Sequence, residues 1–268
     1  MRYLIGFDID GTLVNDNSEL STETINYIKE LTAEGHIVSL ITGRPFRTTK
    51  HLYEQLELKT PLGNYSGSSI HNPNDDSFET IEFKMNPKVI TDLMEKYSEY
   101  VLNGFCEIEE KVYLFNEDEG LAKWLSIPGG ELIVGTYDIK ENISGSVLFV
   151  RAEKAQEIED FCLSYPNLGC RYWRSLKADE HSVMEIYTTL SSKAKAMEVI
   201  REYYDIPHEN TITVGDGTND IEMLEYANYS ASMLNAPERV QNAAKYEAES
   251  NNEDGAIKFV QKVLNNKL

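Results

Sequence analysis

The sequence predicts an α/β protein: a doubly wound, mostly parallel sheet whose chain is interrupted by a second, inserted α/β domain. Three observations favour this fold class. Short apolar runs alternate with amphipathic runs in the first third of the chain, the same alternation returns in the last third, and the stretch between them has a different rhythm. Such alternation is typical of parallel strands joined by helices that cover both faces of a sheet. The 268 residues leave room for one to two domains of about 150 residues.

The predicted core has two segments, residues 1–82 and 185–268. In the first helix, Ser21 supplies a capping oxygen at the start, and Gly35 supplies a residue that tolerates positive φ at the end. Apolar periodicity predicts the remaining elements. The expected strands are 3–9, 36–41, 211–214 and 229–233, and the expected helices are 22–34, 46–56, 193–204, 221–226, 237–245 and 255–264.

Residues 83–184 are predicted to form the inserted α/β domain. The alternative is a single larger domain with a mixed sheet. The expected helices of the insertion are 87–100 and 153–165, and its expected strands are 106–115 and 146–152.

The chain is strongly acidic, because 25 Lys and Arg stand against 45 Asp and Glu, a formal net charge of −20. This charge repels nucleic-acid backbones and anionic membranes, so we expect neither as a partner. It also gives no general attraction for anionic metabolites. A phosphorylated ligand would therefore need a metal ion or a few well-placed cations.

The three cysteines, Cys106, Cys162 and Cys170, have no C-x-x-C spacing, which argues against a zinc module or a disulfide framework. Asp8 and Asp10 interrupt the apolar N-terminal run, and no eighteen apolar residues follow one another anywhere in the chain. We therefore expect a cytoplasmic protein in a reducing compartment.

The first strand ends in Phe7-Asp8-Ile9-Asp10-Gly11, which places two carboxylates two residues apart. Their side chains share one face of the strand, and at its carboxyl end they project into the crevice where parallel α/β sheets bind ligands. Gly11 allows the tight turn that follows. The alternative is an Asx turn that merely closes the strand.

The second strand runs into Thr42-Gly43-Arg44-Pro45 at the same edge of the predicted sheet. A hydroxyl and flexible backbone N–H groups at this place suit a phosphate oxygen. The alternative is an ordinary helix entry, with Thr42 as the cap and Pro45 in the first turn.

A third strand ends in the run GDGTND, which adds Asp216, Asn219 and Asp220 to this edge. With Asp8 and Asp10, four carboxylates would converge and raise one another's pKa unless a cation neutralises them. Because the cluster offers oxygen ligands and no His or Cys, Mg²⁺ suits it better than zinc. The alternative is a Gly-rich loop with solvated acids.

Lys193 lies at the predicted start of a helix, where its charge opposes the helix dipole. An anion held nearby would explain a lysine at this position. The alternative is a routine surface lysine, since Lys195 is two residues away and could serve equally well.

Taken together, these motifs resemble those of the haloacid dehalogenase (HAD) superfamily, in its Cof-like branch of phosphatases with an inserted α/β cap. The resemblance implies a Rossmann-like, HAD-like catalytic core at 1–82 and 185–268 and a cap at 83–184. DIDGTL resembles the first motif with Asp8 and Asp10, ITGR the second with Thr42, Lys193 the third, and GDGTND the fourth.

The resemblance implies a Mg²⁺-dependent phosphatase that forms an aspartyl-phosphate on Asp8. Asp10 would protonate the leaving group and then activate water, and Asp220 would orient Lys193 or a metal-bound water. The expected metal-binding residues are Asp8, Asp10 through its backbone carbonyl, Asp216 and Asp220, and the expected phosphate-binding residues are Thr42, Gly43, Lys193 and Asn219.

Substrate selection is expected to involve the cap and two departures from the family pattern. Relatives commonly have Asn-Gly-Ala where this chain has Ser66-Gly67-Ser68, and a glycine at the position of Leu234. In the cap, a cationic and aromatic cluster suits a sugar hydroxyl or a second phosphate, although it could also be a solvated strand and loop. The candidate specificity residues are Arg171, Trp173, Arg174 and Asn235.

The expected substrate is a small phosphorylated metabolite, with a sugar phosphate favoured by similarity to the branch, and the expected assembly is a monomer or homodimer. Two alternative functions remain open. A sugar phosphomutase would share every core residue but return the phosphoryl group to the sugar. A phospho-accepting signalling protein would use Asp8 without needing Asp10 or the insertion. A non-catalytic binding protein fits less well, since Asp10 has no obvious use there.

Overall fold

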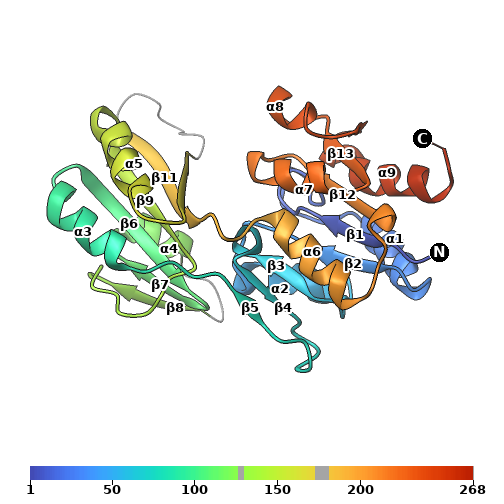
Figure 1. Cartoon of the computed structure of the whole chain (residues 1–268), viewed down its shortest axis with the longest axis horizontal. Helices are drawn as coiled ribbons and strands as arrows, with labels where there is room; N and C mark the ends of the chain where they lie inside the picture. The colour runs from blue at the N-terminus through green and yellow to red at the C-terminus, as the bar shows by residue number, and fades with distance from the viewer. Residues whose placement is uncertain (126–129, 173–180, 268) are drawn as a thin grey trace. The chain divides into compact units, whose positions relative to one another are not determined.

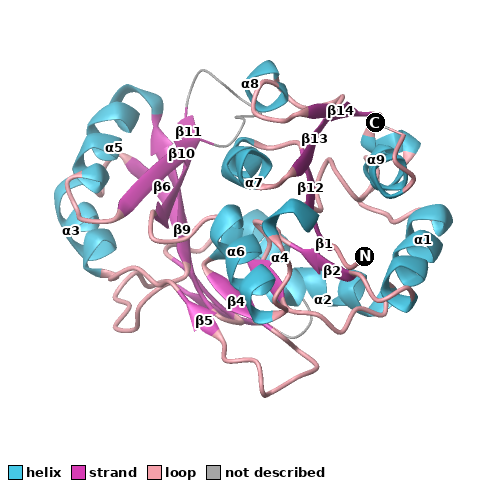
Figure 2. Ribbon diagram, turned by 45° about the vertical axis from the view of Figure 1, so that its right-hand side comes forward, coloured by secondary structure: helices cyan, strands magenta, loops and turns pink. Residues whose placement is uncertain are grey.

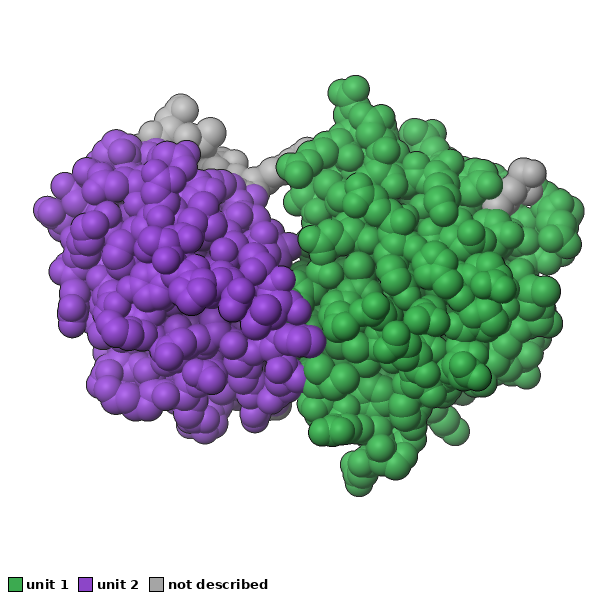
Figure 3. Space-filling view, in the orientation of Figure 1, with its two compact units in different colours: residues 1–44, 49–81, 191–268 green, residues 45–48, 82–190 purple. Residues whose placement is uncertain are grey.

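The computed structural model describes residues 1–125, 130–172 and 181–267 (Figure 1). The chain forms two compact α/β units, shown in different colours in Figure 3. Unit 1 comprises Met1–Arg44, Thr49–Ile81 and Ser191–Leu268, and unit 2 comprises Pro45–Thr48 and Glu82–Leu190. The fold class is the predicted one, a parallel α/β core with an inserted α/β cap.

Unit 1 contains a five-stranded sheet in the order β14-β13-β12-β1-β2, and all of its strand pairs are parallel. β1 lies in the middle, with Leu4 opposite Thr211 of β12 and Ile37 of β2. Every residue of these three strands is buried, as their mostly apolar sequence predicts. The strands are β1 (Leu4–Phe7), β2 (Ile37–Leu40), β12 (Thr211–Gly215), β13 (Tyr229–Met233) and β14 (Tyr246–Ala248).

Helices cover both faces of this sheet: α6 and α7 lie on one face and α1 and α9 on the other (Figure 2). The end signals of the first helix are confirmed, because the Ser21 hydroxyl accepts a hydrogen bond from the Thr24 N–H (2.9 Å) and Gly35 has φ +90°. The helices of this unit are α1 (Thr22–Ala33), α6 (Lys193–Tyr203), α7 (Ile221–Tyr226), α8 (Glu238–Gln241) and α9 (Gly255–Leu264).

One further helix, a small sheet and several 3₁₀ turns complete the described elements outside the two large sheets. Helix α2 (Phe46–Gln55) begins among the residues grouped with unit 2 and ends in unit 1. A small sheet has the order β3-β4-β5, with β3 (Leu62–Asn64), β4 (Ser69–His71) and β5 (Ile81–Glu82). The 3₁₀ turns are η1 (Tyr65–Gly67), η2 (Ala152–Lys154), η3 (His208–Asn210), η4 (Thr218–Asp220) and η5 (Asn251–Glu253).

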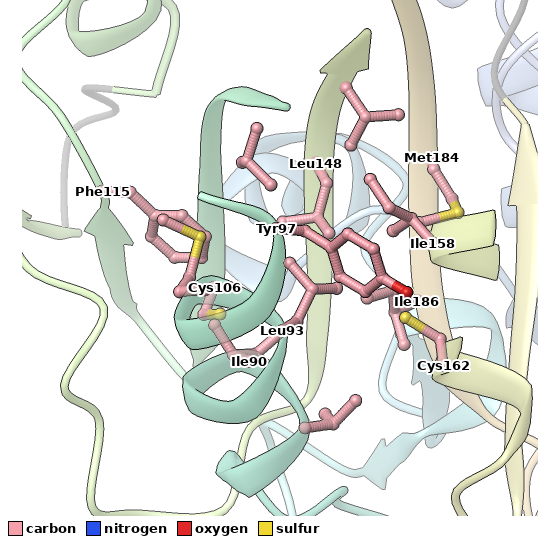
Figure 4. Packing of buried hydrophobic residues seen from close by; sticks show 14 of the residues in the cluster. Ile90, Leu93, Tyr97, Cys106, Phe115, Leu148, Ile158, Cys162, Met184 and Ile186 are labelled. Carbon is pink, nitrogen blue, oxygen red and sulfur yellow. The ribbon is translucent and has the colours of Figure 1, made fainter. Parts of the chain in front are cut away.

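Unit 2 contains a six-stranded sheet in the order β10-β11-β9-β6-β7-β8, antiparallel except for the β7–β8 pair. Helices α3 and α5 pack on one face around an apolar core that includes Leu93, Leu148 and Ile158 (Figure 4). Helix α4 packs on the other face. The elements are α3 (Lys88–Tyr97), β6 (Val101–Ile108), β7 (Lys111–Leu114), α4 (Glu119–Leu125), β8 (Glu131–Val134), β9 (Gly145–Arg151), α5 (Ala155–Leu163), β10 (Leu168–Tyr172) and β11 (His181–Thr188).

Two predicted elements were wrong in extent. The expected strand 106–115 is a hairpin of β6 and β7, because the chain reverses at Glu109, which adopts φ +53° without glycine or asparagine to announce a turn. The expected helix 237–245 ends at Gln241, because the chain must leave the helix to pair β14 with β13. Among the described residues, no helix combines the length and apolar character needed to cross a membrane.

Candidate active site

The three predicted motifs follow three neighbouring strands of the unit 1 sheet. Asp8 comes directly after β1, Asp216 directly after β12, and Thr42 two residues after β2. The Asp8 N–H donates to the Val214 carbonyl (3.1 Å), which extends the β1–β12 ladder to the start of the first motif. Since the strands are parallel, their carboxyl ends meet at one edge of the sheet. Side chains more than 200 residues apart in the chain, such as those of Thr12 and Asp216, therefore come into contact.

Lys193 lies between two carboxylates at this edge. Its Nζ is 2.5 Å from Asp8 Oδ1 and 2.5 Å from Asp220 Oδ1, and its side chain is 1 % exposed. Burial lowers the pKa of Lys193, but the charges of Asp220 and Asp8 outweigh this effect and hold it above its usual value. The lysine is therefore charged. The carboxylates of Asp8 and Asp220 are the anions next to it at the start of the helix.

Asp220 uses both of its oxygens within the protein. Oδ1 accepts from Lys193, and Oδ2 accepts from the backbone N–H groups of Asp216 (3.0 Å) and Gly217 (2.7 Å). The side chain is completely buried. Asp220 thus links the loop after β12 to Lys193.

Carboxylate oxygens of Asp8, Asp216 and Asp220 all lie within 4.8 Å of one another. Burial, and then the charge of Asp220, raise the pKa of Asp8 well above its usual value, while Lys193 opposes the shift. Burial and Asp220 also raise the pKa of Asp216, to about 6. Three carboxylates against one lysine leave an excess of negative charge, and hard oxygen donors of this kind fit a divalent cation such as Mg²⁺.

Two neighbours hold Asp216 in place. The Thr12 hydroxyl donates to Asp216 Oδ1 (3.2 Å). Gly11 has φ +71°, and a Cβ at this position would lie 2.3 Å from Asp216 Oδ2. The close approach of the two loops therefore requires glycine at position 11, both for its backbone conformation and for its missing side chain.

Asp10 lies apart from this carboxylate group. Its side chain is 59 % exposed and forms a two-pronged ion pair with Arg44, whose Nε donates to Oδ2 (2.8 Å) and whose Nη2 donates to Oδ1 (2.5 Å). The hydrogen bonds to Asp10 raise the pKa of Arg44 above its usual value. The side chain of Asp10 is therefore oriented by Arg44 rather than by the carboxylates around Lys193.

The expected phosphate-binding residues gather beside the same edge. Asn219 Nδ2 donates to Ser66 Oγ (3.1 Å), and a Cβ on Gly43 would lie 3.6 Å from that amide nitrogen and 3.7 Å from the hydroxyl. Thr42 is fully buried, and its hydroxyl accepts from the Arg44 N–H (3.1 Å). A small anion in this place would meet the Asn219 amide and the Ser66 hydroxyl together.

The predicted specificity residues belong to both units of the chain. Arg171 belongs to unit 2. Its Nε lies 3.3 Å from Glu185 Oε2, and its guanidinium carbon lies 4.1 Å from the centre of the Tyr187 ring. Trp173 and Arg174 lie outside the described residues. Asn235, in unit 1, donates to the Gly11 carbonyl (2.8 Å) and so supports the loop after the first motif.

Sequence reasoning missed the contacts of three residues at the site: Thr12, Arg44 and Ser66. Thr12 and Arg44 belong to the motifs DIDGTL and ITGR, so their place in the motifs was available as a signal. Ser66 was noted as a departure from the family pattern without a contact. Its φ of +54°, in a residue other than glycine, belongs to a tight turn that brings its hydroxyl to Asn219.

Comparison with known proteins gives a consistent result. A family model described as haloacid dehalogenase-like hydrolase matches residues 5–260. A Bacillus subtilis protein named 5-amino-6-(5-phospho-D-ribitylamino)uracil phosphatase YitU is 33% identical over 265 residues, 96% of each chain. A second B. subtilis phosphatase with the same named substrate, YcsE, is 27% identical and covers 96% of this chain and 94% of its own.

Solved structures with the same fold include a haloacid dehalogenase-like hydrolase from Bacteroides thetaiotaomicron, with a TM-score of 0.80 and 23% identity over 98% of this chain and 100% of its own. Another is described as a HAD subclass IIB sugar phosphatase, with a TM-score of 0.78 and 20% identity over 99% of this chain and 100% of its own. At these identities the structures establish the fold.

Proposed function

Since the chain belongs to the haloacid dehalogenase-like hydrolases and is a phosphatase, we propose that it hydrolyses small phosphate monoesters through an aspartyl-phosphate on Asp8. The observation that carries this proposal is the contact of Lys193 with both Asp8 and Asp220, at a sheet edge that Asp216 shares. A nucleophilic carboxylate and an anionic phosphate repel each other. Lys193 supplies one positive charge against this repulsion, and a divalent cation held by the carboxylates would supply the rest.

In the first half-reaction, a carboxylate oxygen of Asp8 attacks phosphorus. The bond from phosphorus to the ester oxygen breaks, its electron pair stays on that oxygen, and Asp10 supplies the proton that the oxygen takes up. Lys193 fixes the rotation of the Asp8 carboxylate through its contact with Oδ1. Thr42, Gly43, Lys193 and Asn219 would hold the other phosphoryl oxygens.

In the second half-reaction, water attacks the phosphorus of the aspartyl-phosphate. Asp10 takes the proton from this water, the bond between phosphorus and the Asp8 oxygen breaks, and the carboxylate is restored. Proton transfer of this kind contributes about 10²- to 10⁴-fold to the rate. Asp10 ends the cycle protonated again, as the next leaving group requires.

Asp8, Asp216 and the backbone carbonyl of Asp10 would hold a Mg²⁺ ion, and Asp220 would serve Lys193 instead, because both of its oxygens are already engaged. When bound, the ion supplies positive charge that stabilises the phosphoryl group in the transition state. Thr12 keeps Asp216 turned toward this place.

The proposed substrate class is a phosphorylated sugar or polyol. The named substrate of two similar phosphatases carries a phosphorylated ribityl chain, and a structural neighbour is described as a sugar phosphatase. Comparing kcat/KM for hexose phosphates, pentose phosphates and a phosphoribityl compound would rank these possibilities. The cap is the unit expected to contact the leaving group and to set this ranking.

The test of the mechanism is phosphate release from 4-nitrophenyl phosphate with and without Mg²⁺, together with mass spectrometry of the acid-quenched enzyme. We expect sustained release and a phosphoryl group on Asp8. Asp8→Asn should abolish both while leaving the far-UV circular dichroism unchanged. Wild-type turnover by purified Asp8→Asn would contradict the proposal, and labelling without sustained release would indicate a phospho-accepting protein instead.

A further inference from the structure

Arg44 has no role in the mechanism described above, although it is the residue that contacts the acid-base group. We propose that Arg44 is a positioning residue for Asp10, which holds the carboxylate in the orientation needed to pass a proton to the leaving group and to accept one from water. The inference rests on the proposed function, because it requires that Asp10 transfers protons in a phosphatase reaction.

The geometry of the contact sets an orientation as well as a position. Two parallel hydrogen bonds, from Nε to Oδ2 (2.8 Å) and from Nη2 to Oδ1 (2.5 Å), fix the plane of the carboxylate as well as its location. A single hydrogen bond would leave that plane free to rotate. Because the Asp10 side chain is 59 % exposed, little packing is available to restrain it in any other way.

Arg44 itself starts from a backbone that is held on both sides. Its N–H donates to Thr42 Oγ1 (3.1 Å), and its carbonyl accepts from Asn64 Nδ2 (2.8 Å) and from the Tyr65 N–H (3.2 Å). Asn64 is completely buried. The guanidinium therefore projects from a fixed point, in the same turn that supplies Thr42 and Gly43 to the expected phosphate site.

The chemistry of the pair suits orientation rather than proton transfer. A guanidinium stays protonated at all relevant pH values and only donates hydrogen bonds, so Arg44 does not compete for the proton that moves. A carboxylate offers about four lone-pair directions, and Arg44 occupies two of them. The other directions stay available to a leaving-group oxygen or to water.

The consequence is a defined effect on turnover. Misplacing a catalytic group by about 1 Å can reduce the rate ~10²-fold. Loss of Arg44 should therefore lower kcat and leave KM nearly unchanged, since the phosphate contacts belong to other side chains. Lysine in its place keeps the charge but not the two-pronged contact, so it should restore part of the rate.

The experiment is a double-mutant cycle on 4-nitrophenyl phosphate with saturating Mg²⁺, using the full chain. We expect Arg44→Met to lower kcat by ~10- to 100-fold with KM changed by less than about threefold, and Arg44→Lys to recover part of the loss. In the Asp10→Asn background, either change at Arg44 should alter kcat by less than about twofold, because the residue it orients no longer transfers protons. The matched control is Arg239→Met, an exposed arginine of α8 in the same unit.

Three results would overturn the proposal. An equal loss from Arg44→Met in the wild-type and Asp10→Asn backgrounds would mean that Arg44 acts independently of Asp10. A loss confined to KM would mean that it binds the substrate. If Asp10→Asn alone turns over like the wild type, Asp10 does not transfer protons, and the proposed mechanism fails together with the role of Arg44. The first two results, in contrast, overturn only the role of Arg44 and leave the proposed mechanism in place. Should Arg44→Met fail to fold, the cycle with Arg44→Lys decides the matter.

Discussion

The two units treat buried charge in opposite ways. In unit 1, Lys193 faces Asp8 and Asp220, with Asp216 close by, so negative charge is in excess. In unit 2, Arg47 forms an ion pair with Glu107, and their side chains are 3 % and 14 % exposed. Burial raises the pKa of Glu107, and Arg47 opposes that shift. The charges of Arg47 and Glu107 offset each other, whereas the three carboxylates around Lys193 leave negative charge that a further cation could neutralise.

The largest effect should come from removing the one buried cation of the cluster. Lys193→Met should lower phosphatase turnover by ~10²- to 10³-fold, because an electrostatic contact to the reacting groups is lost. It should also lower the free energy of unfolding by ~3–5 kcal/mol, since two carboxylates remain buried without their partner. Kinetics and urea unfolding measure these effects.

Lys195→Met is the control for that change, because Lys195 lies on the same helix and pairs with Glu198 at its exposed surface. It should remain close to the wild type in both measurements. Equal losses in the two variants would show that the contacts of Lys193 with Asp8 and Asp220 contribute no more than an ordinary surface ion pair.

Breaking the Arg47–Glu107 pair should lower stability without lowering phosphatase turnover. Glu107→Ala removes the carboxylate that Arg47 contacts in a buried ion pair, so it should lower the free energy of unfolding by ~3–5 kcal/mol. Turnover of 4-nitrophenyl phosphate per folded molecule should stay within about twofold of the wild type. A loss of kcat comparable to that of Lys193→Met would show that the Arg47–Glu107 pair also contributes to turnover, which would contradict the comparison.

Gly11 offers a sharper test within unit 1. Gly11→Ala forces a side chain into positive φ and places Cβ against the Asp216 carboxylate, so we expect a loss of ~1–3 kcal/mol in stability and weaker Mg²⁺ activation. Gly35→Ala introduces the same kind of strain at φ +90° with no atom within 4 Å. Gly35→Ala should therefore lower the free energy of unfolding but leave the activation by Mg²⁺ unchanged. An equal weakening of Mg²⁺ activation in both variants would show that the contact between position 11 and Asp216 is not its cause.

The smallest effect concerns pH and metal. The pKa of Asp216 is raised to about 6, so the metal-free folded state holds a proton that the unfolded chain releases near pH 4. The metal-free protein should therefore lose stability as pH rises from about 4 to 6. Mg²⁺ needs the deprotonated carboxylate, so it should raise Tm by several degrees at pH 7.5 and by much less at pH 5. Thermal unfolding with Mg²⁺ or EDTA measures this, and equal shifts at both pH values would contradict it.

The sequence predicted the parts of the site that depend on local signals. β1, β2 and β12 are short, mostly apolar runs, and the acids or hydroxyl that follow them are visible in the sequence. The parallel order therefore brought Asp8, Thr42 and Asp216 to one edge, as expected. The β6–β7 hairpin escaped prediction because Glu109 carries the turn without a residue that favours it. The Asp10–Arg44 pair spans 34 residues, and nothing in their spacing specifies the contact.

The strand order of unit 1 also has a consequence for folding during synthesis on the ribosome. β1 can pair with β2 soon after synthesis begins, but its other neighbour, β12, starts at Thr211. Throughout that interval one border of the nascent sheet carries unpaired backbone groups, which are a template for association with other chains. The border is covered only when the C-terminal segment supplies β12, so the complete sheet requires nearly the whole chain.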